Sequence, residues 1–447
     1  MKKTALALTF ALSSSLIAAP VAVAQSSLPN LSSGFSSNGR DPETPTQPSN
    51  PRPDEVSEGL DVNIVGDVLG PGISNQVGFL SGDLGTMVKV GVGEEFAIIF
   101  GDSFRGLTVG QGEWLSPVGV VAVKDPDGRI RILRPLNSGD RVEQLIKYRH
   151  NSDGLTLLPS DVININGTLY LHAMWNEGLG NVLREEIFKS TNNGQTWQPV
   201  QTIPANYLGG KGELVSWEQG PDGYIYMVST SFLRKDDVYL TRFRPEDIGN
   251  YKVWEHLSFD GAEPVWGSEY EPALGTNVRA GEMNLRYIDG HWVLAMFNEQ
   301  RLAIEVRISE DIARDWNAIT PADVAVHGYG GWGDPQTPDN FSQLYGGYIV
   351  PGSTIANMDL VISQWNTSDD SRYMSTQFNV KGLDKFFGIT QNNLRSRSFG
   401  PAQDNLGNQG VILVDETAGV DAAVQEQLAL ERIAEDSTEL VIVPLDQ

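Results

Sequence analysis

The chain has 447 residues without a single cysteine, and its 57 acidic and 32 basic side chains give a formal net charge of −25. The lack of cysteine excludes disulfides, a thiolate nucleophile and cysteine-ligated metal sites. The excess of negative charge argues against nucleic acid and anionic membranes as partners. A chain of this length can nevertheless bury enough apolar surface to fold without covalent crosslinks.

The N-terminus has the pattern of an export signal. Lys2 and Lys3 precede an apolar run, Ala5–Val23, and a small-x-small motif ends at Ala24. This arrangement predicts a secretory signal peptide over residues 1–24 and a secreted protein, extracellular or associated with the cell wall. A retained membrane anchor is the alternative, but Pro20 interrupts the run. No later segment approaches the roughly 20 apolar residues of a membrane span, so we expect no span after signal removal.

Two more segments differ in composition from the rest of the chain. Residues 25–58 are rich in Ser, Pro, Asn and Gly, which predicts a disordered spacer. Residues 401–447 form an acidic tail in which Val420, Val424 and Leu428 fall on one helical stripe. We therefore expect a partly helical tail, either a docking helix or a partly disordered segment.

Residues 59–400 have the texture of an all-β domain. Short apolar or alternating runs recur there, each bounded by Gly, Asn, Asp or Pro, and few segments have a helical period. Ser190–Trp197 fits the S-x-[DN]-x-G-x-T-W hairpin, the Asp-box, which is typical of propeller blades. About 340 residues divide into five four-stranded blades of roughly 65–70 residues each. We predict a five-bladed β-propeller, with a jelly-roll sandwich as the alternative.

Acidic residues next to strand ends are the candidate catalytic groups. Asp83 and Asp102 each follow a glycine and border two short apolar strands, and an antiparallel pair of strands can bring two carboxylates into one site. Paired carboxylates are the minimum equipment for hydrolysing a glycosidic bond. Asp161, at the start of a later strand, is a third candidate. Turn formation is the alternative role of such Gly-Asp dipeptides and of a strand-opening Asp.

Candidate substrate-binding residues come from three regions and one isolated tryptophan. Glu282, Asn284 and Arg286 alternate with apolar residues and would share one strand face, toward either a wet central cavity or an exposed outer surface. Sugars stack their apolar faces on aromatic rings, while amides, carboxylates and guanidinium groups bind the hydroxyls. The other candidates of these types are Trp114, Tyr345, Gln364, Trp365 and Asn366. A core position is the alternative for each aromatic residue.

Motifs for cofactors are missing from the sequence. The five histidines are scattered without the spacing of a zinc site, and there is no phosphate-binding loop, dinucleotide fingerprint or G-x-S-x-G elbow. We therefore predict no catalytic metal and no organic cofactor. A structural calcium ion in a propeller channel stays compatible with the sequence, and the oligomeric state is not predicted.

Taken in order, the motifs between Leu60 and Lys381 resemble those of the DUF4185 family. They are Gly82–Leu84, Gly101–Phe104, Trp114–Pro117, Pro159–Ile163, Ser190–Trp197, Gly281–Tyr287, Leu344–Tyr348 and Ser363–Asn366. One departure is Asn192, where the Asp-box of the family usually has Asp. The tail beyond Gly400 has no assigned counterpart.

The resemblance implies an activity. The DUF4185 family looks like the endo-D-arabinanases of glycoside hydrolase family 183, which are found in mycobacteria, corynebacteria and bacteria that feed on their walls. The resemblance implies a five-bladed propeller that hydrolyses internal α-D-arabinofuranosyl linkages of arabinogalactan or lipoarabinomannan. By position, Asp83 and Asp102 match the opening acids of the family, and Asp161 and Glu282 match later ones. The alternatives are a propeller lectin that binds arabinan without cutting it and a wall-organising protein.

Overall fold

The structure is a computed structural model that describes residues 52–91, 93–150, 154–178 and 180–389. The predicted signal peptide, most of the predicted spacer and the acidic tail lie outside these residues. The described end of the spacer lies against the folded domain, because the backbone N–H of Val56 donates to Asp339 Oδ1 (2.8 Å) and Ser57 N–H donates to the Asp323 carbonyl (2.9 Å). No described helix is long and apolar enough to cross a membrane.

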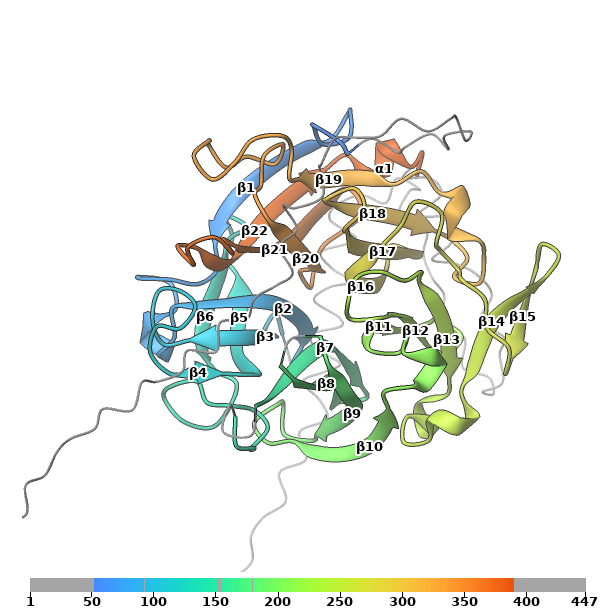
Figure 1. The fold of residues 1–447 in the computed structure, drawn as a ribbon, viewed down its shortest axis with the longest axis horizontal. Helices are drawn as coiled ribbons and strands as arrows, with labels where there is room; N and C mark the ends of the chain where they lie inside the picture. The colour runs from blue at the N-terminus through green and yellow to red at the C-terminus, as the bar shows by residue number, and fades with distance from the viewer. Residues whose placement is uncertain (1–51, 92, 151–153, 179, 390–447) are drawn as a thin grey trace, which may run out of the picture. The chain divides into compact units, whose positions relative to one another are not determined.

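The described residues form five antiparallel sheets arranged as the blades of a propeller (Figure 1), which confirms the predicted fold. Blade 1 contains β2 (Ser81–Lys89), β3 (Phe96–Phe104), β5 (Val118–Lys124) and β6 (Ile130–Pro135), with β4 (Trp114–Leu115) on β3. Blade 2 contains β7 (Leu155–Ile165), β8 (Thr168–Glu177), β9 (Val182–Ser190) and β10 (Gln198–Pro204). Blade 3 contains β11 (Leu214–Gln219), β12 (Ile225–Thr230), β13 (Tyr239–Phe243), β14 (Glu255–Asp260) and β15 (Glu263–Gly267).

Blades 4 and 5 complete the ring. Blade 4 contains β16 (Ala280–Ile288), β17 (His291–Asn298), β18 (Ala303–Ser309) and β19 (Ala322–Val326). Blade 5 contains β20 (Leu344–Ile349), β21 (Asn357–Trp365), β22 (Tyr373–Lys381) and β1 (Asp61–Asp67). The described helices are α1 (Leu383–Phe386) and the 3₁₀ turns η1 (Asn75–Val77), η2 (Tyr207–Gly209), η3 (Pro245–Asp247), η4 (Tyr251–Val253) and η5 (Trp316–Ala318).

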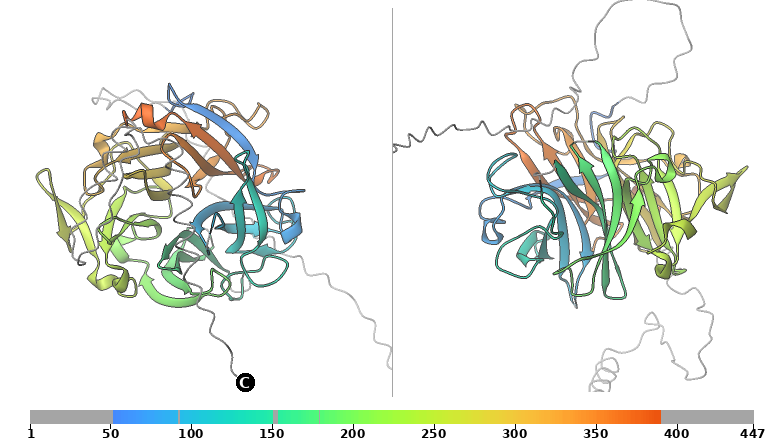
Figure 2. Two further views of the ribbon diagram at one scale, coloured as in Figure 1. Left: turned by 180° about the vertical axis from the view of Figure 1, so that it is seen from behind. Right: turned by 60° about the horizontal axis from the view of Figure 1, so that its bottom comes forward.

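The ring is closed by joining the two ends of the folded chain in one blade. The first strand of the described chain, β1, pairs with the last one, β22, and is the outermost strand of blade 5. The innermost strands β2, β7, β11, β16 and β20 neighbour one another around the centre (Figures 1 and 2). Closure of this kind leaves few long exposed strand edges. The hairpin β14–β15 extends outward from the ring (Figure 1).

Apolar packing between blades explains why several strands read as continuous apolar runs. All eight residues of β17 are buried, which fits a strand with a neighbouring blade on each face. Between blades 2 and 3 the packed residues include Ile187 of β9, Trp217 of β11 and Met227 of β12. Burying each such side chain contributes about 1.5–3 kcal/mol. The core therefore lies between the blades, and the innermost strands are held at fixed positions around the centre.

The Asp-box hairpin joins β9 to β10, and Asn192 takes the role expected of Asp. Its side-chain Oδ1 accepts from the Thr196 N–H (3.0 Å) and from the Ser190 hydroxyl (2.9 Å). The Trp197 indole donates to the carbonyl of Gly194 (2.9 Å). Gly194 has φ +86°, and a Cβ there would lie 2.8 Å from Leu136. An amide therefore supplies the acceptor that the loop needs, so the departure at Asn192 leaves the hairpin intact.

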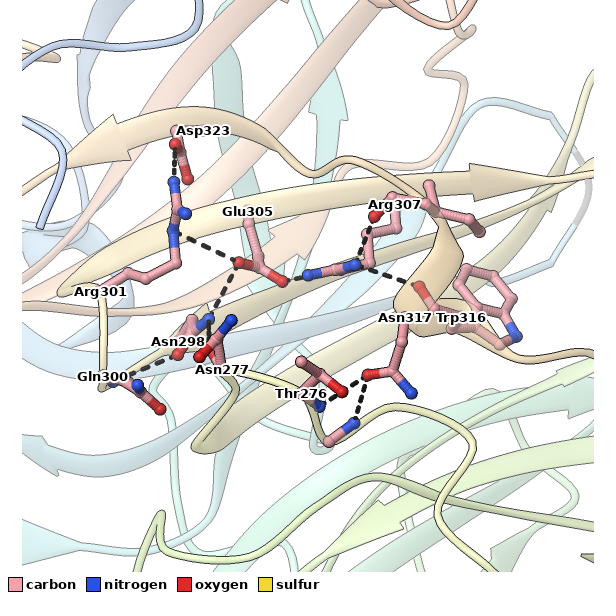
Figure 3. Close-up of polar contacts among 12 residues, drawn as sticks. Thr276, Asn277, Asn298, Gln300, Arg301, Glu305, Arg307, Trp316, Asn317 and Asp323 are labelled. Carbon is pink, nitrogen blue, oxygen red and sulfur yellow. Dashed lines mark hydrogen bonds and ion pairs between the residues drawn. The ribbon is translucent and has the colours of Figure 1, made fainter. Parts of the chain in front are cut away.

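A buried ion network holds blade 4 together (Figure 3). Glu305 is fully buried and accepts from Arg307 Nε (2.9 Å) and from Asn298 Nδ2 (3.0 Å). Arg301 lies 3.9 Å from Glu305 and pairs with Asp323 of β19. Because every charge has an opposite charge or hydrogen bonds nearby, the desolvation cost of the buried ions is offset. The network ties β18 to β19 and has a structural role.

Candidate active site

Two backbone irregularities in β2 set the direction of Asp83. The pairing of β2 with β3 shifts register between Gly82 and Leu84 and again after Leu84. Leu84 has φ +61°, and its N–H donates to the Ser363 hydroxyl of blade 5 (2.9 Å). Bulges are frequent beside active sites because they redirect a side chain. Here they place Asp83 near the start of the innermost strand of blade 1.

Asp102, near the end of β3, lies across from this bulge. Its Oδ1 accepts from the Trp114 indole N–H (2.9 Å), and its carboxylate also bonds the Ser116 side chain. The residue before it, Gly101, leaves room for the first carboxylate, since a Cβ there would lie 2.7 Å from Asp83 Oδ1. The structure therefore brings Asp83 and Asp102 into one site.

Asp83 has one bonded and one free carboxylate oxygen. The hydroxyl of Tyr345 donates to Oδ2 (2.9 Å), and Tyr373 adds a side-chain hydrogen bond. Oδ1 is buried and has no partner among the described residues. A buried carboxylate oxygen without a partner is costly unless the group is protonated or meets a ligand. In the folded protein Asp83 therefore carries a proton or meets a ligand.

Burial changes the protonation of both acids. Burial, then the charge of Asp102 and that of Glu282, raise the pKa of Asp83 from 3.8 to about 8, against the opposing effect of the tyrosine hydrogen bonds. Burial also raises the pKa of Asp102 to about 6, opposed by its bonds to Trp114 and Ser116. The two acids titrate together, so near neutral pH the pair retains one proton. Asp83 is the group that holds the proton more tightly.

A third acid, Glu282, acts electrostatically on Asp83 and is bonded by Arg234, a residue that the sequence analysis did not single out. Arg234, in the loop between β12 and β13, donates to Glu282 Oε1 (2.6 Å). Its guanidinium lies over the rings of Tyr345 (5.2 Å) and Phe297 (5.1 Å). The second oxygen of Glu282, Oε2, is buried and finds no partner in the described part of the chain. No local motif marks Arg234, because the packing of blades 3, 4 and 5 around the centre brings its loop to Glu282 and Tyr345.

An aromatic row runs beside the two aspartates. The ring of Trp365 contacts Tyr373 (5.7 Å between centroids), and Tyr373 contacts Phe104 (5.8 Å). Phe104 stacks on Trp114 at 6.0 Å with an interplanar angle of 16°. The two inner rings are buried, while Trp365 and Trp114 are partly exposed. The row therefore has a partly exposed indole at each end, and two of its rings, Tyr373 and Trp114, bond Asp83 and Asp102.

The structure gives Asp161 a full set of protein partners. Arg286 of β16 donates to both of its oxygens at 2.9 Å. The hydroxyls of Thr86 and Ser216 and the N–H of Trp217 (3.1 Å) occupy the remaining positions. Asp161 is completely buried and links the innermost strands of four blades. It therefore brings no free oxygen to a substrate, and the geometry assigns Asp161 and Arg286 a structural role.

The three candidate amide side chains form hydrogen bonds mainly with other groups of the protein. Gln364 is fully buried and its Oε1 accepts from Arg372 (2.6 Å). Asn366 donates to the Ser371 hydroxyl (2.9 Å) within its own turn. Asn284 accepts from a backbone N–H of β20 (3.0 Å), and its buried Nδ2 has no partner among the residues that the structure describes. Their main contacts position the strands and turns around the carboxylates.

Comparison with known proteins shows the family to which this chain belongs. A β-propeller whose first blade carries two partly buried aspartates beside the tyrosines of blade 5 is the class that fold and site define. The chain belongs to the family described as "Domain of unknown function (DUF4185)", whose family model matches residues 70–379. This confirms the resemblance found in the motifs.

One relative and two solved structures illustrate the similarity. An uncharacterized 35.9 kDa protein from the asd 3′ region of Mycolicibacterium smegmatis is 30% identical over 289 residues, covering 60% of this chain and 83% of that protein. A "putative hydrolase" from Bacteroides ovatus has a TM-score of 0.50 at 11% identity, over 70% of this chain and 89% of that one. The arabinanase Arb43A of Bacillus subtilis has a TM-score of 0.40 at 13% identity, over 69% and 97%. The likeness to the Bacteroides protein is one of fold.

Proposed function

We propose that the protein is a glycoside hydrolase that cleaves internal α-D-arabinofuranosyl linkages of cell-wall arabinan. The observation that carries this proposal is the aspartate pair. Asp83 and Asp102 lie in one partly buried site and share a proton near neutral pH, and Asp83 Oδ1 has no partner in the described part of the chain. One protonated and one ionised carboxyl group are what glycosidic hydrolysis needs.

The two acids have different roles in this proposal. Asp83, which holds its proton more tightly, donates it to the glycosidic oxygen while the bond to the anomeric carbon breaks. Asp102, with the lower pKa, stabilises the developing positive charge and either attacks that carbon or activates the water that does. In the first case Asp83, now ionised, takes a proton from the water that cleaves the glycosyl-enzyme, which releases Asp102 and restores the proton on Asp83. The Trp114 and Ser116 bonds favour the ionised form of Asp102.

Glu282 and Arg234 bind substrate hydroxyls beside the pair. The free Oε2 of Glu282 can accept a hydroxyl, and the ion pair with Arg234 fixes the carboxylate in place. The exposed parts of Trp114 and Trp365 offer stacking surfaces at the ends of the aromatic row. The site thereby combines an acid, a base and apolar sugar-binding surface.

Arabinan as the substrate and export from the cell are further parts of the proposal. The motif order resembles endo-D-arabinanases, and a mycobacterial relative is 30% identical over 289 residues. The strongly negative chain suits an uncharged polymer. The N-terminal 24 residues have the signal-peptide pattern, which would bring the propeller to the wall.

The product profile on purified polymers tests the function. Mature protein incubated with mycobacterial arabinogalactan should release oligoarabinosides, seen by chromatography and mass spectrometry, and should release nothing from xylan or from the galactan core. Release of single arabinose units alone would contradict internal cleavage. Saturable binding to arabinogalactan without any product would contradict the hydrolase and favour a lectin.

A further inference from the structure

A group of buried oxygen atoms between blades 2 and 3 has no hydrogen-bond partner among the described residues. They are both carboxylate oxygens of Glu185, Oδ1 of Asn176 and the hydroxyl oxygens of Ser229 and Ser231. Glu185 and Ser229 are 0% exposed, Asn176 is 1% and Ser231 is 4%. Each unsatisfied buried polar group costs about 1–3 kcal/mol, and an ionised carboxylate costs more. So many in one region favour a partner other than the described residues.

Strand register directs the central members of this group toward each other. Glu185 lies two residues before Ile187 on β9, and Ile187 packs against Trp217 of blade 3. Ser229 of β12 pairs with Val215 of β11, and Val215 belongs to the same interblade cluster. Directly paired residues, and residues two apart on one strand, share a sheet face. Glu185 and Ser229 therefore project into the same interface, from opposite sides.

Electrostatic and backbone contacts place the other members beside Glu185. Its charge contributes to the raised pKa of Tyr207, after burial and against the side-chain bond to Thr241. Burial, and next the charge of Glu213, raise the pKa of Glu185 to about 9. Glu213 accepts from the N–H of Phe232 (2.8 Å), the residue after Ser231. Asn176 shares the face of Glu185, since it lies two residues after Met174, which pairs with Glu185. Asn176, Glu185, Ser229 and Ser231 thus belong to one part of the interface between blades 2 and 3, which we call the interblade pocket.

We propose that the interblade pocket binds a hard metal cation, Na⁺ or K⁺. Every unsatisfied atom named is an oxygen, the ligand type that hard cations prefer. One buried carboxylate among neutral oxygens is balanced by a single positive charge. Glu213 at the edge of the pocket already faces Lys235.

Such a donor set also differs from an ordinary divalent site. The described residues hold no group of three or more His, Asp or Glu side chains suited to a metal. The bound cation would connect β8 and β9 with β12, and so hold blades 2 and 3 together. None of the pocket residues belongs to the aspartate pair, so the cation would act on stability rather than on the chemical step.

Thermal unfolding at constant ionic strength tests the proposal on the full mature chain. Replacing choline chloride with NaCl or KCl should raise the unfolding temperature by roughly 3 °C, with a saturable dependence on the metal ion. Glu185→Gln should abolish that rise, while Glu94→Gln, at a side chain that is 84% exposed, should keep it. Equal unfolding temperatures of the parent in choline, sodium and potassium salts would overturn the proposal. A CaCl₂ effect at micromolar concentration without any effect of Na⁺ or K⁺ would overturn the assignment to a monovalent ion.

A milder variant and a crystal keep the proposal testable if Glu185→Gln fails to fold. Ser229→Ala removes one ligand, and it should raise the metal concentration for half-maximal stabilisation at least fivefold. Crystals soaked in RbCl should show an anomalous peak bounded by β9 and β12. Unchanged metal dependence of Ser229→Ala, or water alone in the pocket, would show that the pocket is only hydrated.

Discussion

The most informative single substitution is Asp83→Asn, because it tests the unusual protonation of this residue without relying on any substrate. The pKa of Asp83 is about 8 in the folded protein, against an ordinary value of 3.8. Between pH 4 and 7 the folded state therefore keeps a proton that the unfolded chain releases, and the free energy of unfolding falls as pH rises. The slope is about 1.4 kcal/mol per pH unit, which accumulates to roughly 4 kcal/mol at pH 7.

Coupling reduces this figure, because Asp83 shares its proton with Asp102. We take about 2–4 kcal/mol as the expected range. Asn carries no titratable proton, so the variant lacks this penalty. The stability of Asp83→Asn relative to the parent should therefore increase by that amount between pH 4 and pH 7.

Urea unfolding at several pH values, followed by fluorescence of the 10 tryptophans, measures this difference directly. Glu94→Gln is the control, because its solvent-exposed side chain should leave the pH dependence of the parent unchanged. A stability difference between Asp83→Asn and the parent that stays constant from pH 4 to pH 7 would refute the raised pKa. The assignment of Asp83 as the acid would then have no electrostatic basis.

Three further substitutions test the rest of the site. Gly101→Ala places a Cβ 2.7 Å from Asp83 Oδ1. The kcat on arabinogalactan should therefore fall at least tenfold, while the circular dichroism spectrum stays that of the parent. An unchanged kcat would contradict the argument that Gly101 leaves room for Asp83. Trp114→Phe keeps a ring but removes the N–H that donates to Asp102, so the pKa of Asp102 should rise. The acidic limb of the pH–rate profile should then move to higher pH. An unmoved limb would show that this hydrogen bond does not lower the pKa of Asp102. Asp161→Asn leaves the buried guanidinium of Arg286 without its counter-charge. It should lower the free energy of unfolding, measured by urea titration, by about 3–5 kcal/mol. A loss below about 1 kcal/mol would contradict the structural role of Asp161.

Local patterns in the sequence predicted the fold well. Short apolar runs between turn residues indicated an all-β domain, and the Asp-box at Ser190–Trp197 favoured a propeller over a sandwich. Chain length then set the number of blades. These features are encoded within a few neighbouring residues, where turn chemistry and side-chain alternation decide the local structure.

The site was only partly predictable, because its contacts join distant parts of the chain. Asp83 and Asp102 were found through their adjacent glycines on paired strands. The partner of Asp83, Tyr345, lies 262 positions away, and the partner of Asp161 lies 125 positions away. Alternation in β16 showed that Glu282 and Arg286 share a strand face, but it could not show that Arg286 would be occupied by a buried aspartate.

The catalytic roles of the aspartate pair stay predictions until activity is measured. The most direct measurement compares initial rates of reducing-end release from purified arabinogalactan for the parent, Asp83→Asn and Asp102→Asn, with folding checked by circular dichroism. We predict measurable release by the parent and at least a hundredfold loss in both variants, since each removes an essential proton donor or acceptor. Parental rates in either folded variant would contradict the pair as the catalytic centre.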